Sequence, residues 1–178
     1  MRVIAGKARG TRLAAPKGSS IRPTLDRVRE SLFNILSGHL EGARFLDLFA
    51  GTGANGIEAL SRGAQSACFV ASNAQALNTV RRNLEISHLA SDAVCLRLHL
   101  PSGLPRLDGS YDLIFADPPY NFSNYTSLLE GFCEHNLASP GAQIIIEHQK
   151  GATLPTQCGP LERHRESRYG GTQLSFYA

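Results

Sequence analysis

Apolar residues recur along the chain at two spacings, one typical of helices and one typical of strands. Within residues 26–36, Val28, Leu32 and Leu36 follow one another every four residues, and Gly38 comes next as a stop signal. This spacing predicts an amphipathic helix over 26–36. Further on, short apolar runs that suit strands alternate with longer segments of helical spacing. The predicted elements are strands at 43–48, 66–70, 93–98, 111–116 and 142–147 and helices at 54–62, 74–87 and 123–137.

This alternation predicts an α/β fold with a mainly parallel sheet. The end of the chain differs, because Tyr169-Gly170-Gly171 separates two strand-like segments, 161–168 and 172–177, and so predicts an antiparallel hairpin. We therefore expect a Rossmann-like fold with a seven-stranded sheet, helices on both faces and the hairpin at one side. Ligands of such sheets bind beyond the carboxyl ends of the strands. The segments that follow 43–48 and 111–116 are thus predicted to share one cleft.

The composition indicates one domain that lacks membrane, metal and disulfide signals. The 178 residues are 42% hydrophobic, which is enough chain for a sizeable core. No run approaches the length of a membrane span, and the first residues lack the apolar segment of a secretory signal. We therefore expect a soluble, cytoplasmic protein. The four cysteines are widely spaced and no histidine pair stands at ligand spacing, so neither a metal site nor a disulfide framework is indicated.

The positive charge is concentrated in the first 30 residues. Eight basic and two acidic side chains give this segment a net charge of +6, so the other 148 residues carry −3 of the total of +3. A basic arm at 1–25, ahead of a nearly neutral domain at 26–178, predicts contact with phosphate backbones. The alternative is a solvated tail. The candidate nucleic-acid contacts are Arg2, Lys7, Arg9, Arg12, Arg22 and Arg27.

A glycine-rich segment follows the first predicted strand, 43–48, and leads into a predicted helix. Glycines let backbone approach a ligand closely, and the amides at a helix start attract polar or anionic groups. The glycines at 51, 53 and 56 also satisfy the dinucleotide pattern G-x-G-x-x-G, so a nicotinamide cofactor is an alternative. Asp47 suits ligand contact and a turn-stabilising role equally. The candidate cofactor contacts in this segment are Asp47, Phe49, Ala50, Gly51 and Gly53.

A second motif, Asp117-Pro118-Pro119-Tyr120, follows the predicted strand 111–116. The Asp117 carboxylate and the Pro118 carbonyl can accept both hydrogens of an exocyclic amine, and the Tyr120 ring can stack on a flat base. The two prolines fix the turn; the alternative is a proline turn with a solvated Asp. A hydride-transfer enzyme has no use for an amine-binding turn, whereas an amino-methyltransferase needs both motifs in one cleft. The pair therefore predicts S-adenosylmethionine as the cofactor.

Glu147 and His148 stand at the end of another predicted strand, 142–147. One histidine without a second ligand or a placed base is weak evidence for chemistry. We therefore interpret these two residues as a structural pair.

With these motifs, the whole chain resembles the RsmD family of ribosomal RNA methyltransferases. The resemblance is carried by the blocks 2–10, 22–34, 45–56 and 117–120, and by a Tyr-Gly-x-Thr-like hairpin at 169–172. It implies transfer of a methyl group from S-adenosylmethionine to the exocyclic N2 amine of a guanine in small-subunit (16S) rRNA. It further implies that the arm and the early helix bind this RNA or the small ribosomal subunit. We expect the protein to act as a monomer.

Two strand ends depart from the family pattern. Relatives resemble Val-Glu-x-Asp at the end of the second strand, whereas this chain has Val70-Ala71-Ser72-Asn73 and lacks the carboxylate expected on the ribose. Asn73 or Ser72 is the candidate replacement, and loss of a charge-assisted hydrogen bond costs about 1.5–3 kcal/mol. Leu98-His99, at the third strand end, likewise lacks the acidic or amide residue expected at the adenine. A non-catalytic RNA-binding homologue is therefore an alternative. A DNA adenine-N6 methyltransferase is a further alternative, because it uses the same Asp-Pro-Pro-Tyr turn.

Overall fold

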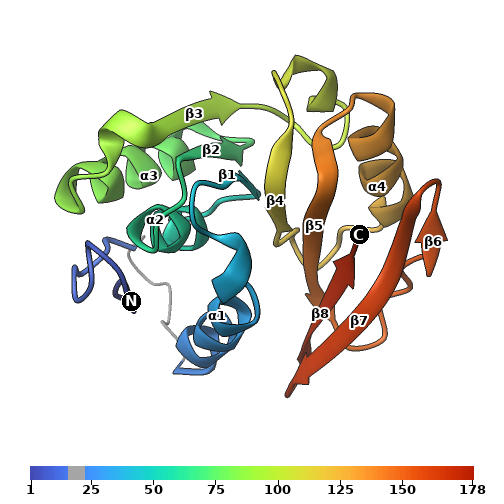
Figure 1. Cartoon of the computed structure of the whole chain (residues 1–178), viewed down its shortest axis with the longest axis horizontal. Coiled ribbons are helices and arrows are strands. Elements are labelled where there is room, and N and C mark those ends of the chain that lie inside the picture. The colour runs from blue at the N-terminus through green and yellow to red at the C-terminus, as the bar shows by residue number, and fades with distance from the viewer. Residues whose placement is uncertain (16–22) are drawn as a thin grey trace.

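A computed structural model describes residues 1–15 and 23–178. One sheet of eight strands runs through it in the order β3-β2-β1-β4-β5-β8-β7-β6 (Figure 1). The first five strands in this order are parallel to one another and the pairs from β5 onward are antiparallel, which confirms the predicted fold class. The strands are β1 (Arg44–Leu48), β2 (Ser66–Ala71), β3 (Ala93–Arg97), β4 (Tyr111–Ala116), β5 (Ala138–Gln149), β6 (Gln157–Cys158), β7 (Leu161–Tyr169) and β8 (Thr172–Tyr177).

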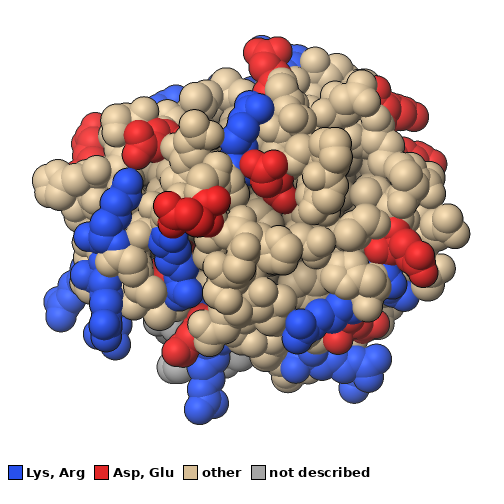
Figure 2. All heavy atoms as spheres, in the orientation of Figure 1, with Lys and Arg blue, Asp and Glu red and all other residues tan. Residues whose placement is uncertain are grey.

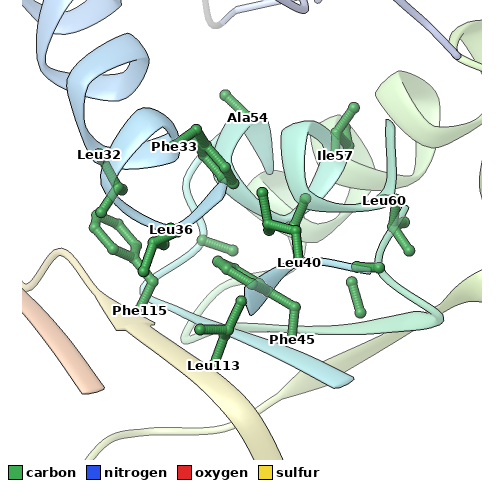
Figure 3. Close-up of a cluster of buried hydrophobic side chains, with 14 of the residues drawn as sticks. Leu32, Phe33, Leu36, Leu40, Phe45, Ala54, Ile57, Leu60, Leu113 and Phe115 are labelled. Atoms are coloured by element: carbon green, nitrogen blue, oxygen red, sulfur yellow. The ribbon is translucent and has the colours of Figure 1, made fainter. Parts of the chain in front are cut away.

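Helices cover both faces of the sheet. Successive side chains of a strand point to opposite faces, so each strand contributes apolar side chains to the core on both sides. Phe45 on β1 lies in a buried cluster with side chains of the first three helices, whereas Leu46 lies in a second cluster with side chains of the fourth. Figure 3 shows the first cluster, in which Leu32 and Phe33 lie over the sheet. The helices are α1 (Pro23–Ile35), α2 (Ala54–Ser61), α3 (Ala74–Ile86) and α4 (Tyr125–Glu134).

Several elements differ from the predicted ones in number or in their boundaries. The sheet has eight strands rather than seven, because the two-residue strand β6 pairs with β7. Helix α4 ends at Glu134 instead of 137, since Asn136 has a positive φ of 52° that a helix cannot contain. Strand β5 consequently begins at Ala138 instead of 142. Helix α1 begins at Pro23, three residues early, and proline suits the first turn of a helix.

The described part of the basic arm, residues 1–15, is folded against the domain. Its two ends meet in an antiparallel bridge between Arg2 and Arg12, and Val3, Ala8 and Leu13 are buried. The alternative of a solvated tail is therefore wrong for residues 1–15. The division of the chain at residue 25 stays a prediction.

Buried polar side chains of α2 hold the arm by its backbone. Glu58, which is 0% exposed, accepts the N–H groups of Ile4 and Ala5 at 2.7 and 3.0 Å. The Ser61 hydroxyl accepts the Ala8 N–H at 2.9 Å. A Cβ on Gly6 would lie 1.8 Å from the Ser61 carbonyl oxygen, so the arm approaches this helix as closely as only glycine allows.

Residues 1–15 and 23–178 contain neither a membrane-spanning helix nor a cluster of potential metal ligands. No helix there is long and apolar enough to cross a membrane. No group of three or more His, Cys, Asp or Glu side chains there is placed to hold a metal ion. All four cysteines are free thiols.

Candidate active site at the carboxyl edge of the sheet

Strands β1 and β4 are neighbours at a topological switch point. From β1 the chain continues to β2 on one side, and from β4 it continues to β5 on the other. Open α/β sheets bind ligands where the strand order reverses in this way. The Asp117 N–H, directly after β4, donates a hydrogen bond to the Leu48 carbonyl at the end of β1 (3.3 Å). The two sequence motifs therefore meet at one edge, as the strand order predicted.

The glycines of the loop after β1 serve two purposes. Gly51 and Gly53 have positive φ angles of 54° and 77°, which side chains with a Cβ rarely adopt. A Cβ on Gly56 would lie 2.3 Å from the Phe69 ring, so this glycine lets α2 pack against β2. A Cβ on Gly51, by contrast, would have a single neighbour within 4 Å, the Phe49 carbonyl oxygen at 3.8 Å. The backbone at Gly51 is thus open to a ligand, whereas Gly56 serves packing.

Asp47 lies beneath this loop. It is 1% exposed, and its Oδ2 accepts the Gly56 N–H at 2.9 Å. Burial raises the pKa of Asp47 to about 8, the Gly56 hydrogen bond opposes this rise, and the charge of Asp117 adds to it. These contacts favour the turn-stabilising interpretation of Asp47. Direct contact with a cofactor stays a prediction.

The other candidate cofactor residues lie around the same loop. The Phe49 ring packs edge-on against Phe122, with 5.3 Å between ring centroids. Ala50 is buried, and its N–H donates to the Val70 carbonyl at the end of β2 (2.9 Å). The loop is therefore fixed both to the neighbouring strand and to the aromatic side chain that follows the Asp-Pro-Pro-Tyr turn.

Asn73 follows β2 and caps helix α3. Its Oδ1 accepts the Ala76 N–H at 2.8 Å, so this oxygen is already engaged. The side-chain Nδ2 remains for a ligand and can only donate. Arg97 at the end of β3 donates to the Ser72 carbonyl (3.3 Å), which brings a cation to the strand ends where the family resemblance predicts acids. The departure seen in the sequence therefore has no acidic substitute at these two strand ends.

The Asp-Pro-Pro-Tyr turn forms one wall of a pocket of about 320 Å³. Pro118 is buried, while Tyr120 is 82% exposed and presents its ring to solvent. The Phe122 N–H donates to the Pro119 carbonyl (2.8 Å), and the Gln149 amide donates to the Tyr120 carbonyl (3.3 Å). These bonds hold the turn in place. The other walls of the pocket are Tyr125, Glu147, His148, Gln149 and Thr172.

Two carboxyl groups stand at equivalent positions on neighbouring strands of this pocket. Ala116 pairs with Ile146 in parallel register, so the next residues, Asp117 and Glu147, follow side by side. Asp117 is accessible to solvent but lies in a recess of the surface, and the surrounding protein raises its pKa to about 6. Burial, and then the charge of Asp117, raise the pKa of the half-buried Glu147 to about 8. Neighbouring groups that resist ionisation in a recess are typical of functional sites.

His148 differs from these carboxyls because both of its ring nitrogens have partners. Nδ1 lies 3.0 Å from the Gln149 carbonyl, which can only accept, so Nδ1 carries the proton. Nε2 then accepts from the Ser175 hydroxyl at 2.9 Å, and burial lowers the pKa of the ring. The structural interpretation holds for His148. The same interpretation did not foresee that Glu147 lines the pocket, although the position of Glu147 at a strand end was a usable signal.

The candidate RNA contacts that the structure describes lie on the arm and on α1. All are exposed, and the Lys7 ammonium lies 3.5 Å from the Asp92 carboxylate. Figure 2 shows Lys and Arg side chains at the lower left of the molecule, where Figure 1 places the arm and α1, and a further group at the lower right, over β7 and β8. Arg22 lies outside the described residues. The exposed candidates are Arg2, Lys7, Arg9, Arg12 and Arg27.

Comparison with known proteins gives matches over the whole chain. The family described as "Conserved hypothetical protein 95" matches residues 1–178. YlbH of Bacillus subtilis (strain 168) is 38% identical over 180 residues, which cover 99% of this chain and 98% of that protein. "Ribosomal RNA small subunit methyltransferase D" of Escherichia coli (strain K12) is 32% identical over 177 residues, which cover 99% of this chain and 89% of that protein. The solved structure of yhhF from Escherichia coli superimposes with a TM-score of 0.85 at 31% identity, covering 99% of this chain and 96% of that one.

Proposed function

Since the chain belongs to the RsmD family of ribosomal RNA methyltransferases, we propose that it transfers a methyl group from S-adenosylmethionine to the exocyclic N2 amine of a guanine in 16S rRNA. The observation that carries the proposal is the Asp117–Leu48 hydrogen bond, which joins the amine-binding turn to the end of β1, where the glycine loop begins. A cofactor at the loop and an amine at the turn would be neighbours in one cleft. The proposal includes action as a cytoplasmic monomer, with an arm at 1–25 and a catalytic domain at 26–178.

The loop after β1 fits a cofactor that combines a carboxylate with a nucleoside. Within the described residues, the N–H groups of Gly51 and Thr52 donate no hydrogen bond, and the backbone at Gly51 is open. These amides would hold the carboxylate, while Phe49 and the Nδ2 of Asn73 would meet the nucleoside. When bound, S-adenosylmethionine supplies a methyl group already activated by the sulfonium charge. Asp47 contributes by fixing the loop through Gly56.

The Asp-Pro-Pro-Tyr turn would hold the amine. Asp117 and the Pro118 carbonyl accept the two N2 hydrogens, and a flipped-out guanine stacks on Tyr120. Positioning N2 in this way lowers the barrier, because reacting atoms no longer have to find each other. Positive charge develops on N2 as its bond to the methyl carbon forms, and the Asp117 carboxylate stabilises that charge. N2 then releases one proton to this carboxylate and becomes a neutral secondary amine that carries the methyl group.

The basic arm and α1 would bind the phosphate backbone of the RNA. Arg2, Arg9 and Arg12 are exposed on a segment that the buried Glu58 holds in place. Cations on an ordered support bind phosphates with less loss of conformational entropy than cations on a free tail. We infer that the arm orients the RNA while the pocket holds the base.

The direct test is the variant Asp117→Ala. We expect formation of N2-methylguanosine in 16S rRNA, measured by mass spectrometry, to fall by at least about 100-fold, as when one essential electrostatic partner of a transition state is removed. Calorimetric affinity for S-adenosylmethionine should stay within about threefold, since Asp117 is not proposed to touch the part of the cofactor that anchors it. Glu130→Ala, at an exposed acid on α4, is the matched control.

Three results would contradict parts of this proposal. Methylation by Asp117→Ala at the wild-type rate would show that the mechanism is wrong. Failure of the folded wild-type protein to bind S-adenosylmethionine would favour the non-catalytic RNA-binding homologue. Methylation of adenine in DNA, with none in 16S rRNA, would favour the DNA methyltransferase.

A further inference from the structure

Glu147 is the second acidic residue of the pocket, and the mechanism above does not use it. The parallel register of β4 and β5 places Glu147 directly beside Asp117. Phe115 and Ile145, two residues before each acid, lie in the same buried cluster under α1, so both acids project on that face of the sheet. Neighbouring strands lie about 4.8 Å apart. The two carboxyl groups therefore form a pair at the edge of a pocket of about 320 Å³.

The described part of the chain supplies no partner for either carboxyl group. Within residues 1–15 and 23–178, no hydrogen-bond donor and no cation of the chain contacts the Asp117 or Glu147 side chain. The neighbouring polar groups are engaged elsewhere, since His148 bonds to Ser175 and the Gln149 amide bonds to the Tyr120 carbonyl. A half-buried acid without a donor is costly to maintain. The arrangement suits a ligand that brings two adjacent donors of its own.

We propose that Glu147 selects guanine by accepting the N1–H hydrogen bond of the flipped base while Asp117 accepts from N2. This inference rests on the proposed function and specifies how the same site reads its base. Guanine presents N1–H beside the N2 amine on its Watson–Crick edge, and enzymes that flip a base read it along this edge. Two side-by-side acceptors match two side-by-side donors.

The same pair rejects the other bases that carry an exocyclic amine. Adenine and cytosine each place a ring nitrogen that accepts hydrogen bonds beside the amine, so their ring nitrogen would face the Glu147 oxygens. When Glu147 is ionised, the form that a donated N1–H of guanine favours, two acceptors that face each other leave both unsatisfied. A site built to bind a donor discriminates strongly against an analogue that lacks it, by up to about 10⁴-fold. Glu147 would thus separate guanine-N2 from adenine-N6 methylation by the same Asp-Pro-Pro-Tyr turn.

The test compares guanine with 2-aminopurine, which keeps the 2-amino group but has an acceptor in place of N1–H. The methylated guanine is first mapped with the wild-type protein, and RNA is then made with guanine or 2-aminopurine at that position. At pH 8.5, where most Glu147 side chains are ionised because the pKa is about 8, the wild-type protein should methylate the guanine RNA at least about 100-fold faster. Glu147→Gln should lose about 10- to 100-fold on guanine and most of the preference, because its amide can donate to the purine acceptor.

Two further variants and a binding measurement separate base reading from a structural role. Glu147→Asp keeps the acceptor and should keep the guanine preference at a reduced rate. Glu130→Gln, on the exposed side of α4, should match the wild type in both rate and preference. Without cofactor, the fluorescence of 2-aminopurine RNA changes when the base leaves the RNA stack for the pocket, and saturation of this change should require less Glu147→Gln protein than wild-type protein.

Two results would overturn the inference. The first is an unchanged preference in Glu147→Gln, whether both rates stay at the wild-type level or fall equally, since an equal fall indicates a structural role. The second is a loss of preference in Glu147→Asp as complete as in Glu147→Gln. The proposed function has its own separate failure, in which the wild-type protein methylates no guanine in 16S rRNA and the inference falls with it.

Discussion

Among single residues, Asp47 makes the stability of the folded protein depend on pH. Its carboxyl group ionises near pH 3.8 in a model peptide but near pH 8 in the folded protein, because burial disfavours the charge. Between these two values the unfolded chain therefore binds fewer protons than the folded one. The free energy of unfolding consequently decreases as pH rises from about 4 to about 8. Glu147 and Asp117, whose pKa values are also raised, act in the same direction.

Asp47→Asn should reduce this dependence on pH. The amide oxygen can still accept the Gly56 N–H, but the side chain no longer ionises. Relative to the wild type, the variant should gain stability between pH 5 and pH 8, measured by urea unfolding at both values. Asp108→Asn, at an exposed position, is the control and should follow the wild type. Parallel pH profiles for Asp47→Asn and the wild type would contradict the raised pKa of Asp47.

Gly56→Ala tests the packing role of the last loop glycine. Its new methyl group would lie 2.3 Å from the ring of Phe69, which is 0% exposed. We expect the free energy of unfolding to fall by about 1–3 kcal/mol. Gly38→Ala, where a Cβ meets nothing within 4 Å, should change it by less than about 0.5 kcal/mol. Equal stability of the two variants would mean that α2 shifts freely away from β2.

The sequence motifs made the roles of some single residues predictable. Asp117 and Tyr120 stand in a recognisable turn, so their chemistry could be inferred from residue types alone. Glu147 could not be placed in the same way, because its importance depends on the lateral register between β4 and β5, which the sequence does not state. Asp47 was ambiguous until its bond to Gly56 was known.

At the scale of elements, helix α3 joins the arm to the glycine loop through Asn83. This residue is 0% exposed, and its Oδ1 accepts the Ala14 N–H at 2.7 Å. Its Nδ2 donates to the Ala14 carbonyl at 3.0 Å and to the Thr52 carbonyl at 2.8 Å. One side chain thus fixes the end of the described arm and the loop after β1.

Asn83→Ala should release this end of the arm. Loss of three hydrogen bonds at a buried site should lower the free energy of unfolding by about 2–4 kcal/mol. Trypsin should also cut faster after Arg9 and Arg12, which limited proteolysis would measure. Asn78→Ala, on the exposed side of the same helix, is the matched control. Unchanged proteolysis in Asn83→Ala would show that the contacts of α2 hold the arm without Asn83.

Element types followed from hydrophobic spacing, but several boundaries did not. The end of α4 depends on the positive φ of Asn136, and asparagine favours this conformation at helix ends, but hydrophobic spacing does not register it. Strand β6 has two residues, too few to produce an alternating pattern. The register of β4 and β5 also shifts between Tyr111 and Leu113, which no local sequence signal marks.

For the whole molecule, the positive charge concentrated in the first 30 residues should make RNA binding depend on salt concentration. Each phosphate contact to single-stranded RNA contributes about 0.7 to the slope of log Kd against log salt concentration. Replacing Arg2, Arg9 and Arg12 together with alanine should therefore lower this slope by about 2. Arg106→Ala is the control. Arg106 lies ahead of the first residue of β4, whereas the candidate active site follows the last residue of this strand. An unchanged slope in the triple variant would contradict the role of the arm.

The shared cleft was predictable at this scale because the alternation of elements fixes where parallel strands end. The packing of the arm was not, since its glycines and arginines are equally typical of a tail. Its anchors, Glu58, Ser61 and Asn83, look like ordinary polar residues of amphipathic helices until the arm is seen to cover them.

The exposed ring of Tyr120 has a spectroscopic consequence. The sequence contains no tryptophan and five tyrosines, so ultraviolet emission of the protein comes from tyrosine alone. The other four rings are buried or half-buried, whereas Tyr120 is 82% exposed. A base that stacks on Tyr120 will quench its emission and leave the buried rings unaffected. The protein therefore carries an intrinsic, label-free reporter of base capture at its own pocket.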